Sequence, residues 1–450
     1  MQASQSDQKL FYTLVNRQRK TTSATPPFLI VDGQILQTEN DITEGWKSHF
    51  NNLATPQTRS HFDEKFYNLV EEEGHLIKII TERDSHSTPL QISTKHVLEA
   101  SRASNSNKAA DCQGITAEHI KYGGPTLIKV LTSIVNAVLA TGEVPQQLKT
   151  GIISPVLKKN KDNTIPGNYR GITVTSTFGK LLECIILKII TPRIESYQNP
   201  MQRGFTKSVS PVNAALMVEE CINEAKDNKQ TIALATLDAE KAFDVVWHNG
   251  LLRKLFHLDI PASAWNMIQF LQTKAVSRVK WMDTISNNFE INQGIRQGAK
   301  LSPTSYKVYV NQVLDILSNS GIGAHIGNIY VGAPTVADDI AILADCPADL
   351  QTALHVVFNN SAKDRSTLNV SKSDVVIYNA PSSRTPSSWQ LGSQIGSTVV
   401  KAFAFQADGL GFNSPSGYKV GRPGHFKYVW VGQYEPSCLK FPSSVLEHKL

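Results

Sequence analysis

The feature that most constrains the fold is a set of apolar segments that end at acidic residues. Residues 231–237 (TIALATL) form a continuous apolar run that ends at Asp238, and such a run is typical of a buried strand. A second acidic group, Asp338-Asp339, interrupts the apolar residues between 329 and 345, which predicts a strand, a tight turn and another strand. The chain must therefore bury these strands while three carboxylates remain at their ends.

These three carboxylates suit a metal ion. A buried acid is costly unless it is paired or bound to a cation. Mg²⁺ prefers oxygen ligands and leaves coordination positions for phosphate oxygens. Two such ions about 4 Å apart could activate a 3′-hydroxyl and stabilise a leaving pyrophosphate. The competing interpretation is that Asp338-Asp339 merely forms the turn of a hairpin.

Helical and strand patterns are mixed along the rest of the chain, which predicts an α+β fold. Ser302-Pro303 is typical of a helix N-cap followed by the first helical residue, and Gly321 is a stop signal for that helix. The expected elements are a mainly helical stretch over 96–230, helices over 249–257, 262–273 and 302–319, and a hairpin within 277–295.

A basic segment precedes the first acidic strand. Between residues 149 and 193 there are eight Lys and Arg residues against two acids. Arg170 could bind a triphosphate through two parallel hydrogen bonds, while Lys158 or its neighbour Lys159 would act as a point charge. The alternative is a solvated basic face that binds the backbone of a nucleic acid.

Charge and cysteine usage exclude several other classes. Lys and Arg number 45 against 39 acids, a net charge of +6 that permits a polyanionic partner without requiring one. The five cysteines show no metal-binding spacing, and neither a secretory signal nor an 18-residue apolar run is visible. We expect an intracellular protein, nuclear or cytoplasmic, with no membrane partner; an oligomeric state is not indicated.

Six segments in succession resemble motifs of the reverse transcriptase domain of non-LTR (LINE-like) retrotransposons. They are 155–173 (PVLKKNKDNTIPGNYRGIT), 202–205 (QRGF), 237–248 (LDAEKAFDVVWH), 294–303 (GIRQGAKLSP), 336–339 (VADD) and 368–379 (LNVSKSDVVIYN). The resemblance implies a polymerase right hand, in which fingers precede a palm with an antiparallel sheet and flanking helices. It also implies an RNA-directed DNA polymerase that uses an RNA template, a DNA primer and dNTPs.

The same resemblance assigns roles to individual residues. Asp238, Asp338 and Asp339 would hold two Mg²⁺ ions, for which Mn²⁺ could substitute. Phe243 stands where the family has a steric gate against the ribose 2′-hydroxyl, and Gln297 stands in the motif that packs under the templating base pair.

Lys372 has two interpretations. It matches the position of a lysine that could donate a proton to pyrophosphate, and it could equally be an ordinary surface lysine. The family usually has Tyr or Phe where this chain has Val336, which removes an aromatic contact near the primer end.

The resemblance covers about residues 100–390. We therefore expect a polar, helical lead-in over 1–95, fingers and palm over 96–395, and a divergent, Gly-rich and structureless tail over 396–450. A thumb would be absent or divergent. No endonuclease-like segment precedes the motifs and no Cys/His knuckle follows them, so the chain is expected to be a fragment of an element's reading frame. The rival functions are a decayed nucleic-acid-binding remnant and an RNA-directed RNA polymerase.

Overall fold

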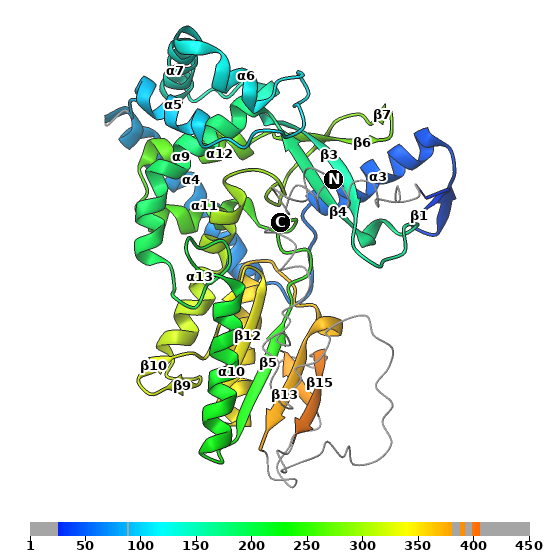
Figure 1. Cartoon of the computed structure of the whole chain (residues 1–450), viewed down its shortest axis with the longest axis vertical. Helices are drawn as coiled ribbons and strands as arrows, with labels where there is room; N and C mark the ends of the chain where they lie inside the picture. The colour runs from blue at the N-terminus through cyan, green and yellow to red at the C-terminus, as the bar shows by residue number, and fades with distance from the viewer. Residues whose placement is uncertain (1–25, 88–89, 380–387, 392–397, 406–450) are drawn as a thin grey trace, which may run out of the picture.

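The computed structural model describes residues 26–87 and 90–379, together with the backbone of 388–391 and 398–405. Helices and two main sheets alternate along the chain (Figure 1). The α+β class predicted from the sequence is confirmed.

The larger sheet carries the acidic strand ends. Its central strand β5 (Ile232–Leu237) lies between β12 (Asp339–Ala344) and β13 (Asp374–Tyr378), antiparallel to both. Its strand order is β11-β12-β5-β13-β15-β14, where β11 is Thr335–Val336. The strands expected from the apolar runs are thus present, although the run before Asp338 is divided into short pieces.

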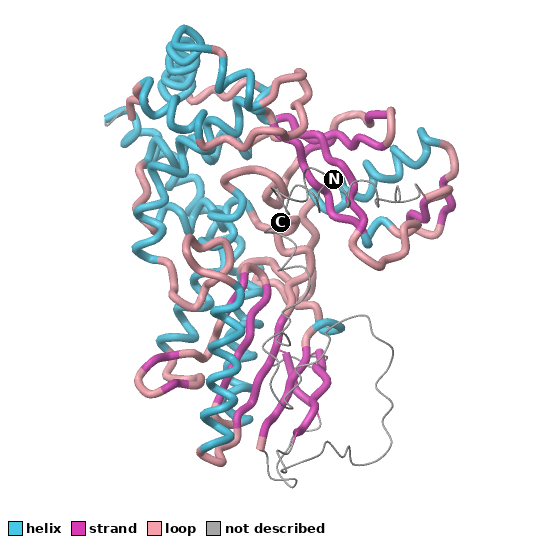
Figure 2. The backbone as a smooth tube through the Cα atoms, viewed as in Figure 1, coloured by secondary structure: helices cyan, strands magenta, loops and turns pink. Residues whose placement is uncertain are grey.

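Helices cover both faces of this sheet, which explains why β5 is apolar throughout. Ile232 and Leu234 pack against α10 (Pro211–Asp227), which lies along β5 in Figures 1 and 2. The alternate residues Ala233, Ala235 and Leu237 belong to a core shared with α13 (Ser302–Asn319) and α14 (Pro347–Lys363). A strand buried on both faces has no solvent side on which to place polar residues.

The predicted helix after residue 301 begins differently from the expectation. Ser302 is the first helical residue, and Leu301 occupies the N-cap. The Ser302 hydroxyl donates to the carbonyl of Arg296 instead of capping the helix. The buried carboxylate of Glu183 accepts hydrogen bonds from the backbone N–H groups of Lys300 and Leu301, which places a negative group at the helix N-terminus.

The smaller sheet corrects the expectation that residues 96–230 are mainly helical. β3 (Thr150–Leu157) and β4 (Tyr169–Thr175) form an antiparallel pair, and β3 runs parallel to β6 (Val276–Trp281). β7 (Thr284–Ile285) and β8 (Phe289–Glu290) complete the sheet within the predicted hairpin region. Sequence reasoning missed β3 and β4, although these two partners are close in the chain; the parallel partner of β3, β6, lies more than a hundred residues further along.

Two described helices that precede residue 95 pack against different parts of the molecule. α3 (Glu39–Ala54) places Trp46 against Tyr169 of the smaller sheet. α4 (Glu64–Ser87) contributes Val70 and Ile77 to the core that contains α11 and α12. The other elements before α13 are β1 (Leu29–Val31), β2 (Gln34–Leu36), α5 (Thr94–Arg102), α6 (Ala117–Tyr122), α7 (Gly124–Thr141), α8 (Gln146–Lys149), a 3₁₀ turn (Pro166–Asn168), α9 (Thr177–Tyr197), α11 (His248–His257) and α12 (Ala262–Gln272).

Among the described helices, α7 alone is long and apolar enough to cross a membrane, a helix that the sequence analysis did not single out. Its residues Ile128, Leu131 and Val135 pack in a core with Val97 of α5 and Leu182 of α9. A core helix meets the same criteria of length and composition.

The predicted tail lies largely outside the described residues. β15 (Thr398–Phe405) pairs in parallel with β13, and β14 (Ser388–Leu391) pairs antiparallel to β15. The expectation that no strand follows residue 395 is therefore wrong for 398–405, where every position except Thr398 and Lys401 is apolar. Residues 406–450 of the tail lie outside the described residues. An absent or divergent thumb there stays a prediction. The remaining short strands are β9 (His325–Ile326) and β10 (Ile329–Tyr330).

Candidate functional site

The pairing of β5 and β12 brings the acids together. Leu237 pairs with Ile340, so the next position in the antiparallel register places Asp238 opposite Asp339. Asp338 lies in the two-residue turn that joins β11 to β12. The three predicted carboxylates are thus neighbours at one end of the sheet.

Burial and mutual repulsion raise the pKa values of two of these acids. The side chain of Asp338 has its pKa raised to about 6, first by burial and then by the charge of Asp238. The pKa of Asp339 is raised to about 9 by burial, by Asp338 and by Asp238. Lys372 opposes both increases. Carboxyl groups with such raised pKa values can release a proton when a cation binds to them.

Asp339 also satisfies a test for cation binding. The residue is only 4% exposed, and neither Oδ1 nor Oδ2 has a hydrogen-bond partner. Buried carboxylate oxygens without a donor are costly, and a divalent cation would satisfy them. Over 26–87 and 90–379, however, no three His, Cys, Asp or Glu side chains are already arranged to hold a metal.

Lys372 lies at the acids rather than elsewhere on the surface. Its Nζ is 2.9 Å from Oδ2 of Asp238, and the lysine side chain is 43% exposed. The backbone supports this pair, because Asn369 N donates to the carbonyl of Asp238 and Ser373 Oγ accepts from Asp238 N. Lys372 is therefore an ion-pair partner of the site.

Phe243 lies in the turn that follows β5, and its ring is held by two aromatic side chains. Tyr306 of α13 stacks on it at 4.8 Å between centroids, with a 10° interplanar angle, and Phe205 meets it edge-on at 6.0 Å. The backbone is fixed as well, because Ile295 N donates to the carbonyl of Phe243. Sequence reasoning missed Tyr306, whose only signal was its place in the first turn of a predicted helix.

Gln297 connects the loop over 294–303 to two other motifs. Its carbonyl accepts from Thr173 N of β4 at 2.7 Å, and its Nε2 donates to Oδ1 of Asp244 at 3.2 Å. Gly298 has a positive φ of 121°, and a Cβ there would lie 2.5 Å from the carbonyl oxygen of Thr173. The close approach of loop and strand therefore requires glycine.

The predicted cations lie on the β3–β4 hairpin and face the acids. Lys158 directly follows β3, where its Nζ donates to the carbonyl of Gly167 at 3.0 Å, and Arg170 pairs with Val156 in the ladder. The pKa of Lys158 is lowered by burial and by the charges of Lys372 and Arg170. Arg170 also opposes the raised pKa of Asp338. Of the two neighbouring lysines, Lys158 interacts electrostatically with Lys372 and Arg170.

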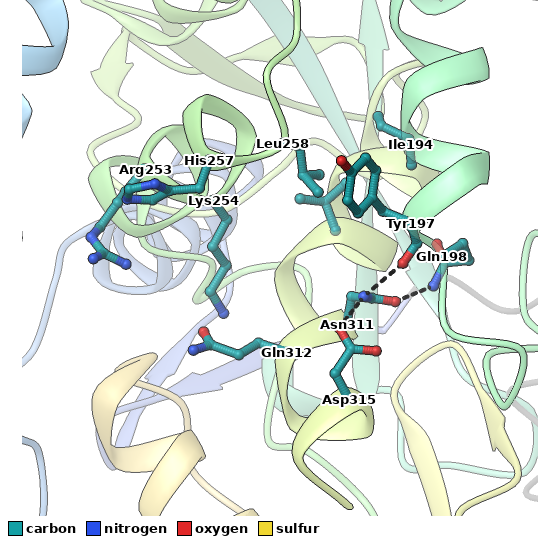
Figure 3. Close-up of a pocket in the computed structure, with 11 residues that line it drawn as sticks. Ile194, Tyr197, Gln198, Arg253, Lys254, His257, Leu258, Asn311, Gln312 and Asp315 are labelled. Carbon is teal, nitrogen blue, oxygen red and sulfur yellow. Dashed lines mark hydrogen bonds between the residues drawn. The ribbon is translucent and has the colours of Figure 1, made fainter. Parts of the chain in front are cut away.

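A separate cavity of about 340 Å³ lies between α9, α11 and α13 and includes none of the predicted site residues (Figure 3). Its polar groups bond to one another: Asn311 Nδ2 donates to Tyr197 O and Asp315 Oδ2, and Gln198 Nε2 donates to Asn311 Oδ1. Lys254, on the same wall, pairs with Asp364 at 2.6 Å. These polar groups are therefore paired, although Gln198 Oε1 is buried without a hydrogen-bond partner.

Comparison with known proteins places the motifs in one family. Residues 156–410 match the family described as Reverse transcriptase (RNA-dependent DNA polymerase). The chain belongs to this reverse transcriptase family. The match includes the end of β3, all of β4, the three acids and Lys372. It also extends to β15, beyond the 395 boundary expected from the sequence.

Several relatives of this reverse transcriptase come from retrotransposable elements. It is 27% identical over 267 residues to the Pol polyprotein of element R2 from Popillia japonica, covering 59% of this chain and 36% of the relative. It is 31% identical over 227 residues to the RNA-directed DNA polymerase of mobile element jockey from Drosophila melanogaster, covering 48% and 23%. The transposon TX1 protein from Xenopus laevis is 23% identical over 371 residues, covering 81% and 27%.

These relatives confirm the predicted resemblance to a LINE-like reverse transcriptase domain. The chain spans about a third or less of the length of each of these three relatives.

Proposed function

We propose that the chain is an RNA-directed DNA polymerase, which transfers a nucleotidyl group from a dNTP to the 3′-hydroxyl of a primer on an RNA template. The observation that carries this proposal is the convergence of Asp238, Asp338 and Asp339 at one sheet end, opposite basic residues of the β3–β4 hairpin. In this proposal the sheet around β5 is the palm and the β3–β4 hairpin belongs to the fingers.

The carboxylates of Asp238, Asp338 and Asp339 would hold Mg²⁺ or Mn²⁺. Bound there, two such ions would supply charge stabilisation for phosphoryl transfer. The unpartnered oxygens of Asp339 support this assignment, as does a donor set made only of carboxylates. Without the cation, the ammonium of Lys372 is ion-paired with the carboxylate of Asp238. A bound cation would replace this ammonium at Asp238, and the ammonium would then face the phosphates.

Arg170 and Lys158 would bind the triphosphate of the incoming nucleotide. Burial, and then repulsion from Lys372 and Arg170, lowers the pKa of Lys158, and a bound polyanion would relieve this repulsion. A group of neighbouring cations is a good anion site. Lys372 would then be placed to donate a proton to the leaving pyrophosphate.

Phe243 favours deoxyribonucleotides over ribonucleotides in this proposal. Its ring cannot easily move away from an incoming sugar, because Tyr306 stacks against one side of it. A 2′-hydroxyl would have to displace a packed aromatic pair. This feature favours a DNA polymerase over the rival RNA polymerase, and the complete acid set argues against a decayed remnant.

Primer extension on an RNA template tests the proposal. Asp338→Asn should reduce extension by about 10³-fold or more, because loss of one ligand from a two-metal site costs several kcal/mol of transition-state stabilisation. The matched control is Asp283→Asn, since Asp283 is exposed in the turn between β6 and β7. Extension at the control rate by a folded Asp338→Asn protein would contradict the proposed site.

A further inference from the structure

The turn that carries Asp338 has an unusual backbone. Ala337 and Asp338 form the two-residue connection between Val336 and Asp339, and Ala337 has a φ of +59°. A residue with a side chain has a steric cost in this left-handed region, because its Cβ comes close to the backbone. Such a conformation persists only where the surrounding structure imposes it.

The side chain of Gln202 contacts the polar backbone groups of Ala337. Its Nε2 donates to Ala337 O at 3.1 Å, and its Oε1 accepts from Ala337 N at 3.0 Å. The same Oε1 accepts from Gly204 N at 2.8 Å. Gln202 is 1% exposed, so these bonds do not compete with solvent. The amide thereby pairs with Ala337 as a neighbouring strand would.

The backbone around Gln202 continues this contact along β11. Met201 O accepts from Thr335 N at 2.9 Å, and Arg203 N donates to Thr335 O at 2.7 Å. A Cβ at Gly204 would overlap the backbone nitrogen of Ala337. The segment over 201–204 therefore forms a brace against the turn, and glycine is needed where the two backbones meet.

We propose that Gln202 is a positioning residue for the carboxylate of Asp338. It acts through Ala337, whose two backbone groups it holds, and it does not itself touch the nucleotide. This inference rests on the proposed function, in which Asp338 binds the catalytic metal. Because displacement of a catalytic group by about 1 Å can cost on the order of 100-fold in rate, a loosened turn reduces catalysis even when the fold is retained.

The test compares Gln202→Met with Gln312→Met. Methionine approximates the volume of glutamine but removes all three hydrogen bonds. Gln312 is an exposed glutamine of α13 that lines the separate cavity. Gln202→Met should lower the kcat of primer extension about 10- to 100-fold, with template–primer affinity unchanged. Gln312→Met should behave as the unchanged protein does.

Hydrogen exchange provides a readout that does not depend on activity. In the unchanged protein the amide of Ala337 should exchange slowly although it lies in a turn, because Gln202 Oε1 accepts its hydrogen. Gln202→Met should remove this protection while amides in the middle of β5 keep theirs. If Gln202→Met cannot be folded, the protection of Ala337 in the unchanged protein still decides the question.

The outcomes separate this inference from the proposed function. Rapid exchange at Ala337 in the unchanged protein, or a kcat for folded Gln202→Met equal to that of the control, overturns the positioning role. If the unchanged protein extends no primer, the proposed function fails. Hydrogen exchange alone then tests whether Gln202 holds the turn. Slow exchange of the Ala337 amide in the unchanged protein, together with fast exchange in Gln202→Met, supports that role.

Discussion

Replacement of Trp46 tests whether the segment before residue 95 is an integral part of the fold. The side chain is completely buried and lies between α3 and the smaller sheet. Its ring meets Tyr169 at 4.6 Å, Trp281 at 5.4 Å and Phe50 at 6.0 Å between centroids. Trp46→Ala therefore removes one ring from a cluster to which β4 and β6 both contribute.

The expected loss follows from burial and ring contacts. Truncation of a buried Trp or Phe to Ala typically costs about 3–5 kcal/mol, because transfer free energy is lost and a cavity remains. Each favourable aromatic pair adds about 0.5–1.5 kcal/mol beyond its buried area. The indole N–H has no hydrogen-bond partner, so its removal slightly reduces the loss of folding free energy. We expect a net decrease of about 4 kcal/mol in the free energy of unfolding.

The assay is urea unfolding followed by far-ultraviolet circular dichroism, which does not depend on tryptophan fluorescence. Lys47→Ala is the control, because Lys47 lies on the same helix and pairs with the exposed Glu44. The effect should extend to catalysis, since Arg170 follows Tyr169 directly: the KM for dNTP should increase. A loss below about 1 kcal/mol would refute the reasoning and make residues 29–54 a weakly attached unit.

Three further predictions concern the site itself. Phe243→Val should lower the preference for dNTPs over rNTPs by about 10-fold or more, as measured by parallel incorporation assays, and an unchanged ratio would make Phe243 an ordinary packing residue. Lys372→Met should tighten Mg²⁺ binding, because the ammonium no longer competes for Asp238, and it should lower kcat. Calorimetry measures the Mg²⁺ affinity and primer extension measures kcat. If neither quantity changes, the assigned position of Lys372 is contradicted. The stabilisation by Mg²⁺ should increase from pH 5.5 to 8.5, because the raised pKa values of Asp338 (about 6) and Asp339 (about 9) exceed those of the unfolded chain. As pH rises from the unfolded to the folded pKa values, the metal-free protein loses stability, and a bound cation offsets that loss. If the thermal shift caused by Mg²⁺ does not vary with pH, these acids are not the binding groups.

The sequence alone determined the parts of the fold whose evidence is local. The apolar run over 231–237 had to be a buried strand, and β5 is buried on both faces. The helices at α11, α12 and α13 followed from periodicity and terminal signals. The grouping of Asp238 with Asp338 and Asp339 was predicted from the resemblance of their motifs. It requires the two apolar strands to be antiparallel neighbours, as β5 and β12 are.

Other features were decided only by the tertiary structure. The β3–β4 pair joins β6, more than a hundred residues away, in one sheet. The N-terminus of α13 is satisfied by Glu183 from another helix, which freed Ser302 for a different bond. Gln202 lies 135 positions before the turn that it holds. Hydrogen bonds and ring contacts over such separations leave no periodic trace in the sequence, because their geometry exists only after the chain has brought distant segments together.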